Sequence, residues 1–315
     1  MPRPDLEKSL PEADVKSIFP PNEDYEYFPD HLEHPFDTQP GSTRWVTASW
    51  CADAALLAYF DEARVRWERD RAGFDQVQFI DRQNTQCFIA HTDQFALVAF
   101  RGTTVLKPGA NLSLSDIRGS ANAAFDALRD VLTDVSVSPN NNVHGGFNKA
   151  LDAVWPQLRE FQQNHPELPV WFTGHSLGGA LAVLAADRYE KLGSQIGGIY
   201  TFGCPVVGNH DFLKSYTLHD RTFRFVNNND WLPALDMGYQ HVGQLRYIAS
   251  TGAIETGANP LGTMLDKFKG SASHAFDTLK SWATFNFDVI PSDALCDHAP
   301  IYYATRVWNY YVNQL

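Results

Sequence analysis

Apolar residues recur along this chain in two patterns that alternate from one end to the other. Short runs rich in apolar and β-branched residues are typical of strands, and longer segments with an apolar residue at every third or fourth position are typical of helices. Strands are predicted at residues 73–81, 85–92, 95–102, 169–174, 196–203, 221–230 and 241–250. Helices are predicted at residues 46–59, 61–71, 114–135, 146–165, 176–193, 261–285 and 298–312. This order predicts an α/β fold with a mostly parallel central sheet and helices on both faces.

Two segments depart from this alternation. Residues 1–45 are rich in proline and acidic residues and are predicted to form an irregular N-terminal arm. Residues 104–134 begin as a loop and continue with apolar residues at helical spacing from Leu114 to Val135. No internal repeat or low-complexity linker divides the chain, so residues 1–315 are predicted to form a single domain.

Composition and charge narrow the classes of function. With 44% hydrophobic and 20% charged residues, the chain has the composition of a globular protein. Its formal net charge of −12 argues against long-range attraction to nucleic acid or to an anionic membrane. No apolar run reaches the length of a transmembrane helix. The N-terminus lacks the basic start and apolar block of a secretory signal, so the expected location is cytoplasmic, or extracellular by a leaderless route or after signal removal.

The cysteines do not indicate a metal site. Cys51, Cys87, Cys204 and Cys296 lie far apart in apolar segments, without the Cys-x-x-Cys spacing of a zinc site. Four buried free thiols are the simplest interpretation, although the sequence alone does not settle pairing. Neither a cofactor nor a metal is expected.

The segment TGHSLGGA, residues 173–180, contains the pattern Gly-x-Ser-x-Gly around Ser176. A predicted strand precedes this pattern and a predicted helix follows it, which is the context of a nucleophilic serine on a sharp strand-to-helix turn. Gly174 and Gly178 would relieve the crowding of such a turn. Ser176 is therefore predicted to be a nucleophile rather than a simple helix cap.

A serine nucleophile needs a base and an acid, which in this arrangement follow it along the chain. His298 is the best placed histidine, because Pro300 suits the first turn of the closing helix and leaves His298 on the loop before it. The alternative role for Asp297 and His298 is to cap that helix. His241 and His274 are the other candidate bases, and a buried structural role is expected for His241.

Asp230 is the predicted acid, because it is the first acidic residue after the apolar strand that ends in FRFVNNND. Pro233 is expected to keep the following loop from becoming helical. An Asx-turn is the alternative role for Asp230. The other candidate acids are Asp211, Asp236 and Asp293.

Two backbone or side-chain donors are needed to bind an oxyanion. The N–H of Leu177, directly after the serine, is the first candidate. Thr103, in the segment FRGTT at the end of an apolar strand, is the second, and Gly102 gives the backbone there freedom to turn.

Six segments, in this order, resemble the class 3 lipase family: VAFRGTT, VHGGF, TGHSLGGAL, YTFGCPVVGN, RFVNNNDWLP and DHAPIYY. They extend over about residues 85–310. The resemblance implies an α/β-hydrolase fold, a triad of Ser176, Asp230 and His298, and an oxyanion hole of Thr103 and Leu177. The segments around 104–134 and 250–294 are longer than in compact members of the family.

The activity implied by the resemblance is triacylglycerol hydrolysis through an acyl-enzyme, with a lipid or ester substrate at a lipid–water interface. Residues 104–134 would then form a lid, and ordinary core packing is the alternative. Phospholipase A1, feruloyl esterase or another carboxylesterase would use the same triad. A non-catalytic scaffold protein is disfavoured, because all three triad positions are filled. Oligomeric state stays open.

Overall fold

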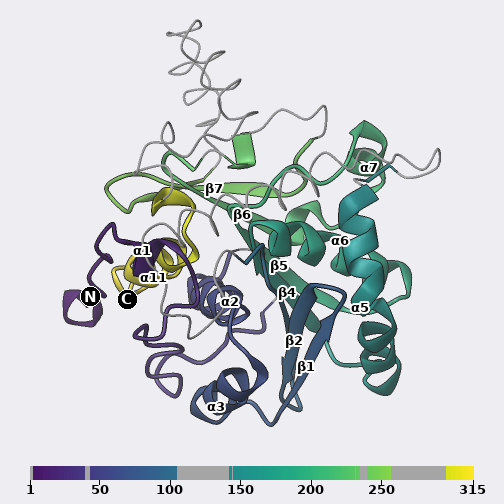
Figure 1. The fold of residues 1–315 in the computed structure, drawn as a ribbon, viewed down its shortest axis with the longest axis horizontal. Helices are drawn as coiled ribbons and strands as arrows, with labels where there is room; N and C mark the ends of the chain where they lie inside the picture. Colours follow the sequence, from purple (N-terminus) through teal and green to yellow (C-terminus); the bar gives the residue numbers. More distant parts are fainter. Residues whose placement is uncertain are drawn as a thin grey trace, which may run out of the picture.

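The computed structural model describes residues 3–39, 43–104, 142–143, 145–230, 232–234, 240–256 and 296–315. These residues form an eight-stranded sheet in which the strands follow one another in chain order (Figure 1). The strands are β1 (Gln76–Arg82), β2 (Thr85–His91), β3 (Ala96–Phe100), β4 (Val170–His175), β5 (Ile196–Phe202), β6 (Thr222–Asn227), β7 (Gln244–Ile248) and β8 (Ile254–Thr256).

The centre of the sheet is parallel, as the sequence predicts. Strands β3 to β7 pair in parallel, whereas β1 and β2 at one edge and β8 at the other pair antiparallel. Each of the seven predicted strands is confirmed, and β8, with only three residues, was not predicted. Because parallel strands end at the same edge, the residues that follow β3, β4, β5 and β6 are gathered at one side of the molecule.

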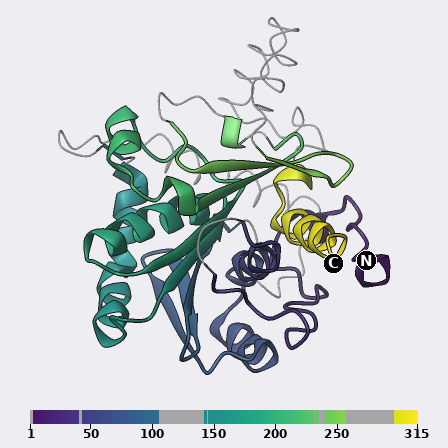
Figure 2. The same ribbon diagram turned by 180° about the vertical axis from the view of Figure 1, so that it is seen from behind.

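Helices cover both faces of the sheet (Figures 1 and 2). The helices are α1 (Val15–Ile18), α2 (Trp45–Leu57), α3 (Glu62–Ala72), α5 (Gly145–Asn164), α6 (Leu177–Lys191), α7 (His210–Ser215) and α11 (Pro300–Val312), with 3₁₀ turns η1 (Pro4–Leu6), η2 (His219–Arg221) and η3 (Leu232–Ala234). One apolar core lies between the sheet and α5 with α6, and a second lies between the sheet and α2 with α11. These two layers sandwich the parallel strands, which explains why β3 is buried along its whole length.

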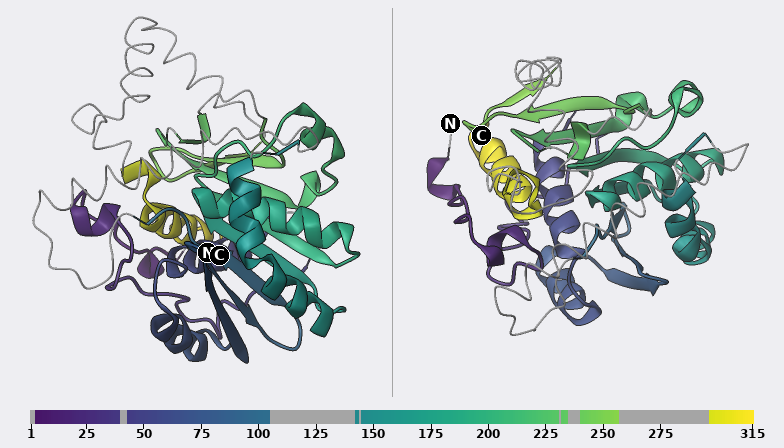
Figure 3. Two further views of the ribbon diagram at one scale, coloured as in Figure 1. Left: turned by 45° about the vertical axis from the view of Figure 1, so that its right-hand side comes forward. Right: turned by 45° about the horizontal axis from the view of Figure 1, so that its top comes forward.

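The described part of the N-terminal arm lies against α2 and α11. The N–H of Arg3 donates to the carbonyl of Val312 at 3.0 Å, and the indole of Trp308 donates to the carbonyl of Leu6 at 2.8 Å. In α2, the carboxylate of Asp53 accepts hydrogen bonds from the Tyr25 hydroxyl and the Phe28 N–H, both at 2.8 Å. The two ends of the chain therefore lie side by side (Figure 3).

Some sequence predictions need correction, and others fall outside the described residues. Pro233 does not keep the chain after Asp230 from becoming helical, because it lies within the 3₁₀ turn η3, whose short repeat accommodates a proline near its start. The short helix α7 was not predicted. All four cysteines are buried and none of them forms a disulfide bond, as expected. The predicted helices at 114–135 and 261–285, and the lid at 104–134 beyond its first residue, lie outside the described residues.

Candidate active site

Ser176 occupies a sharp turn between the end of β4 and the start of α6. Its backbone dihedrals are φ 55° and ψ −127°, a conformation that L-amino acids rarely adopt. Its side chain makes no capping hydrogen bond to α6, so the helix-cap role does not apply. Strained backbone of this kind persists only where surrounding structure holds it, and it is concentrated at functional sites.

Two glycines make this turn sterically feasible, as the sequence predicts. A Cβ on Gly174 would lie 2.3 Å from backbone atoms of Gly178. A Cβ on Gly178 would lie 2.2 Å from the carbonyl oxygen of Phe100 in β3. Neither position tolerates a side chain, because backbone atoms cannot move aside as a flexible side chain would. The turn is thereby packed directly against the end of β3, next to the segment that contains Thr103.

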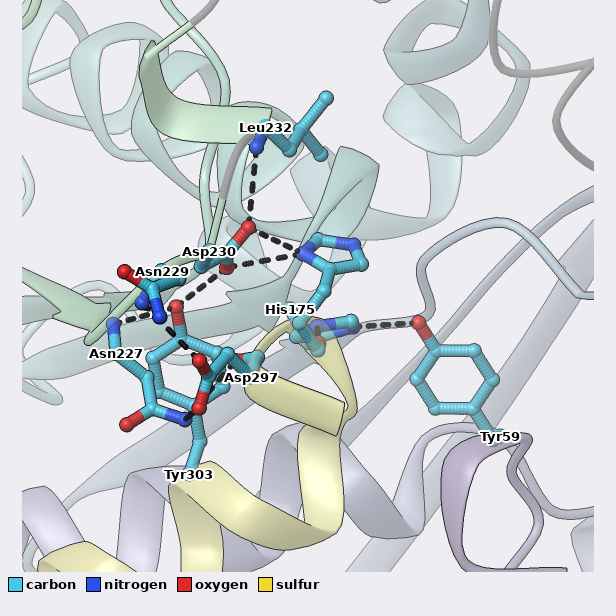
Figure 4. Close-up of polar contacts among 9 residues, drawn as sticks. Tyr59, His175, Asn227, Asn229, Asp230, Leu232, Asp297 and Tyr303 are labelled. Carbon is cyan, nitrogen blue, oxygen red and sulfur yellow. Dashed lines mark hydrogen bonds and ion pairs between the residues drawn. The ribbon is translucent and has the colours of Figure 1, made fainter. Parts of the chain in front are cut away.

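The structure brings Asp230 and His298 together, although 68 residues separate them in the chain (Figure 4). The Nδ1–H of His298 donates to both carboxylate oxygens, at 3.0 and 2.9 Å. Asp230 is fully buried at the end of β6, and the side chain of His298 keeps 14% exposure on the segment before α11. A carboxylate only accepts hydrogen bonds, so this contact places a proton on Nδ1 of His298 and indicates Nε2 as the nitrogen that would act as a base.

Further hydrogen bonds orient the Asp230 carboxylate. The Tyr303 hydroxyl in α11 donates to Oδ2 at 2.6 Å, and the Leu232 N–H donates to Oδ1 at 3.1 Å. The latter is the contact of an Asx-turn, so Asp230 fills that alternative role as well as contacting His298. Burial, with the nearby Asp230 charge, raises the pKa of Tyr303 well above its ordinary value, so Tyr303 stays a neutral donor. Tyr303 was missed in the sequence, where it is one of several aromatic residues of the closing helix.

Asp297 holds the segment before α11 against the turn after β6. Its Oδ2 accepts from the Asn228 amide at 2.9 Å and from the Asn229 N–H at 3.1 Å, and its carbonyl accepts from the Asn227 amide at 3.0 Å. The N-cap of α11 is Ala299 with no side-chain bond, so Asp297 and His298 do not cap this helix. Burial raises the pKa of Asp297, and these donors oppose that rise.

Both predicted oxyanion donors line one cavity beside the turn. This cavity has a volume of about 520 Å³ and is bordered by the segment after β3, the start of α6 and the inner side of α5. Thr103 and Leu177 are both on its wall. The Thr103 hydroxyl is buried and has no hydrogen-bond partner among the described residues, so it is free to donate to a bound group. Leu177 opens α6, where the first N–H groups have no partner within the helix.

The other candidate bases and acids do not join this arrangement within the described residues. His241 is half-buried and donates from Nε2 to the Pro233 carbonyl at 2.7 Å, which is the structural role expected for it. Burial lowers its pKa to about 3, so it is neutral. Asp211 lies in the first turn of α7. His274, Asp236 and Asp293 lie outside the described residues.

Comparison with known proteins points to one family. The sequence model of the family described as "Lipase (class 3)" matches residues 97–239. The secreted mono- and diacylglycerol lipase LIP4 of Malassezia restricta is 34% identical over 151 residues, which cover 44% of this chain and 50% of the relative. The secreted mono- and diacylglycerol lipase A of Penicillium cyclopium is 30% identical over 165 residues, covering 51% of this chain and 50% of the relative.

Among solved structures, one titled "A serine protease triad forms the catalytic centre of a triacylglycerol lipase" superposes with a TM-score of 0.49 at 22% identity, covering 68% of this chain and 84% of the other. The chain spans about half the length of the curated relatives it matches. Within the described residues, no helix combines the length and apolar character needed to cross a membrane.

Proposed function

Because residues 97–239 match the class 3 lipase family, we propose that this chain hydrolyses carboxylic esters of acylglycerols through an acyl-enzyme. Ser176 is the nucleophile, His298 the base and Asp230 the acid, with Thr103 and Leu177 as oxyanion donors. The observation that carries this proposal is the Asp230–His298 hydrogen bond at 2.9 Å beside a serine held at φ 55°. The His298 ring lies 4.7 Å, centroid to centroid, from that of His175, the residue directly before the serine.

In the proposed reaction, Nε2 of His298 takes the Ser176 proton as the hydroxyl attacks the ester carbonyl. The negative charge on the carbonyl oxygen is received by Thr103 and the Leu177 N–H, next to the positive end of α6. His298 then gives its proton to the leaving alcohol, and a water molecule repeats the two steps to release the fatty acid. Asp230 stabilises the imidazolium without becoming protonated.

The names of the relatives refine the substrate class. The two relatives are described as mono- and diacylglycerol lipases. We therefore propose monoacylglycerols and diacylglycerols, as well as triacylglycerols, as substrates of this chain. The proposal extends to secretion, for which the support is that both of these relatives are described as secreted. Residues 104–134 remain the proposed lid over the site, and substrates presented as emulsions are therefore expected to depend on that segment more than soluble esters do.

Labelling and turnover by the Ser176→Ala variant test the proposal. The wild-type protein is expected to react with a fluorophosphonate probe at Ser176 and to hydrolyse p-nitrophenyl esters. The variant is expected to lose both by a factor of about 10⁴ or more while keeping its unfolding midpoint. Hydrolysis of mono-, di- and triolein then ranks the glycerides. Esterase activity that survives in the variant would remove Ser176 as nucleophile.

A further inference from the structure

His175, the last residue of β4, is buried beside the segment that carries His298 (Figure 4). Its Nε2 lies 2.6 Å from the backbone carbonyl oxygen of His298, and its Nδ1 lies 2.8 Å from the Tyr59 hydroxyl. A carbonyl oxygen only accepts hydrogen bonds, so the proton of the neutral ring is on Nε2 and Nδ1 accepts from Tyr59. The side chain next to the nucleophile is thus bonded to the backbone of the base.

Tyr59 extends this connection to the oxyanion segment. It follows α2, on the opposite face of the sheet from α6, and it is fully buried. A Cβ on Gly102 would lie 2.2 Å from the Tyr59 hydroxyl, so this hydroxyl lies directly against the Gly102 backbone. The hydroxyl is therefore in contact with the residue directly before Thr103.

We propose that Tyr59, His175 and the carbonyl of His298 form one buried hydrogen-bond chain, packed against Gly102, that positions the oxyanion segment, the nucleophile and the base relative to one another. His175 and Tyr59 are positioning residues in this proposal, which rests on the proposed function. The three segments come from β3, β4 and the start of α11, and the described hydrogen bonds of His175 join two of them directly.

Two physical reasons make this chain suited to positioning. Burial and the neighbouring His298 lower the pKa of His175 well below its ordinary value, so the ring stays neutral and its direction of donation does not change near neutral pH. Hydrogen bonds in series also polarise one another when water is excluded. A misplacement of about 1 Å between reacting groups can lower a rate about 100-fold, so a buried chain that fixes this spacing has a large effect on turnover.

The test compares removal of two buried tyrosine hydroxyls. Tyr59→Phe breaks the chain, whereas Tyr189→Phe removes the hydroxyl that donates to the Leu158 carbonyl in the core between α5 and α6, away from the site. We expect Tyr59→Phe to lower kcat for a soluble p-nitrophenyl ester about tenfold or more with KM within about twofold. Tyr189→Phe is expected to lower the unfolding midpoint and leave kcat within about twofold of wild type.

A double-mutant cycle separates action through His175 from a general packing defect. In the background of His175→Phe, Tyr59→Phe is expected to have almost no additional effect on kcat, because the chain is already broken. Fully multiplicative effects, or a kcat for Tyr59→Phe equal to that of Tyr189→Phe, would overturn the proposal.

Nitrogen NMR keeps the inference testable whether or not the protein turns over an ester. The His175 ring is expected to show its proton on Nε2 and a hydrogen-bonded Nδ1, and Tyr59→Phe should change the Nδ1 shift. A His175 proton on Nδ1, or an Nδ1 chemical shift that is unchanged in Tyr59→Phe, would contradict the proposed hydrogen-bond chain. Absence of turnover and of fluorophosphonate labelling in the wild-type protein would instead contradict the proposed function.

Discussion

Gly203, directly after β5, leaves room for the contact between Asp230 and His298. Its φ is +59°, and a Cβ there would lie 2.7 Å from Oδ2 of Asp230 and 3.1 Å from Nδ1 of His298. A methyl group would therefore separate the two side chains. We expect Gly203→Ala to lower kcat by about 100-fold, a loss typical of a displaced reacting group.

Gly193 supplies a matched control for this substitution. It also has a positive φ, of +84°, but a Cβ there would meet no heavy atom within 4 Å. Both alanine variants should lose about 1–2 kcal/mol of unfolding free energy, because an L-residue is strained in this conformation. Urea titration and kcat are measured for both. A kcat for Gly203→Ala as high as that of Gly193→Ala would show that the contact tolerates the methyl group.

At the scale of elements, Asp297 joins the end of β6 to the start of α11. In Asp297→Asn, one of the two acceptor oxygens becomes a donor and faces the Asn228 amide and the Asn229 N–H. We expect about 1–3 kcal/mol of lost unfolding free energy, the cost of an unpaired buried polar group. We also expect a fall in kcat of about tenfold, because His298 is the next residue.

Asp53→Asn is the matched control for this change. Asp53 is a buried carboxylate with two donors, Tyr25 and Phe28, and lies in α2 away from His298. It should lose a similar unfolding free energy and keep its kcat within about twofold. If Asp297→Asn and Asp53→Asn lower kcat equally, Asp297 stabilises the fold and has no specific role in positioning His298.

Elements with strong periodicity were predictable from the sequence, and short ones were not. The apolar runs of β3 and β4 and the helix α6 between glycine boundaries give clear patterns. Strand β8 has only three residues, too few to show alternation. In the candidate site, Asp230 and His298 could be proposed from their places at element ends. Tyr59 could not, because it is 116 residues from His175 and only the folded sheet brings them together.

For the whole molecule, the half-buried neutral His241 predicts a loss of stability in acid. Its pKa is lowered from 6.5 to about 3 in the folded protein, so below pH 6.5 the unfolded chain takes up a proton that the folded chain does not. Above pH 6.5 His241 does not lower the free energy of unfolding. As the pH falls from 6.5 toward 3, the free energy of unfolding decreases by about 1.4 kcal/mol per pH unit.

Urea unfolding at pH 7 and pH 5.5 measures this dependence. The wild-type protein is expected to lose about 1.4 kcal/mol more than His241→Gln over that interval, because glutamine has no proton to gain. The other titrating groups are common to both proteins and cancel in the comparison. Equal losses would mean that His241 is protonated in the folded state.

The order in which the site is assembled has a consequence during synthesis on the ribosome. The residues of the strained serine turn and the Phe202 carbonyl that accepts from the Ser176 N–H have all been made once synthesis reaches residue 202. The imidazole that would activate it follows almost 100 residues later, on a segment that packs against the N-terminal arm, which is made before the turn. If the proposed function holds, a nascent chain stalled before residue 298 would thus carry an inert hydroxyl and would not hydrolyse nearby lipids.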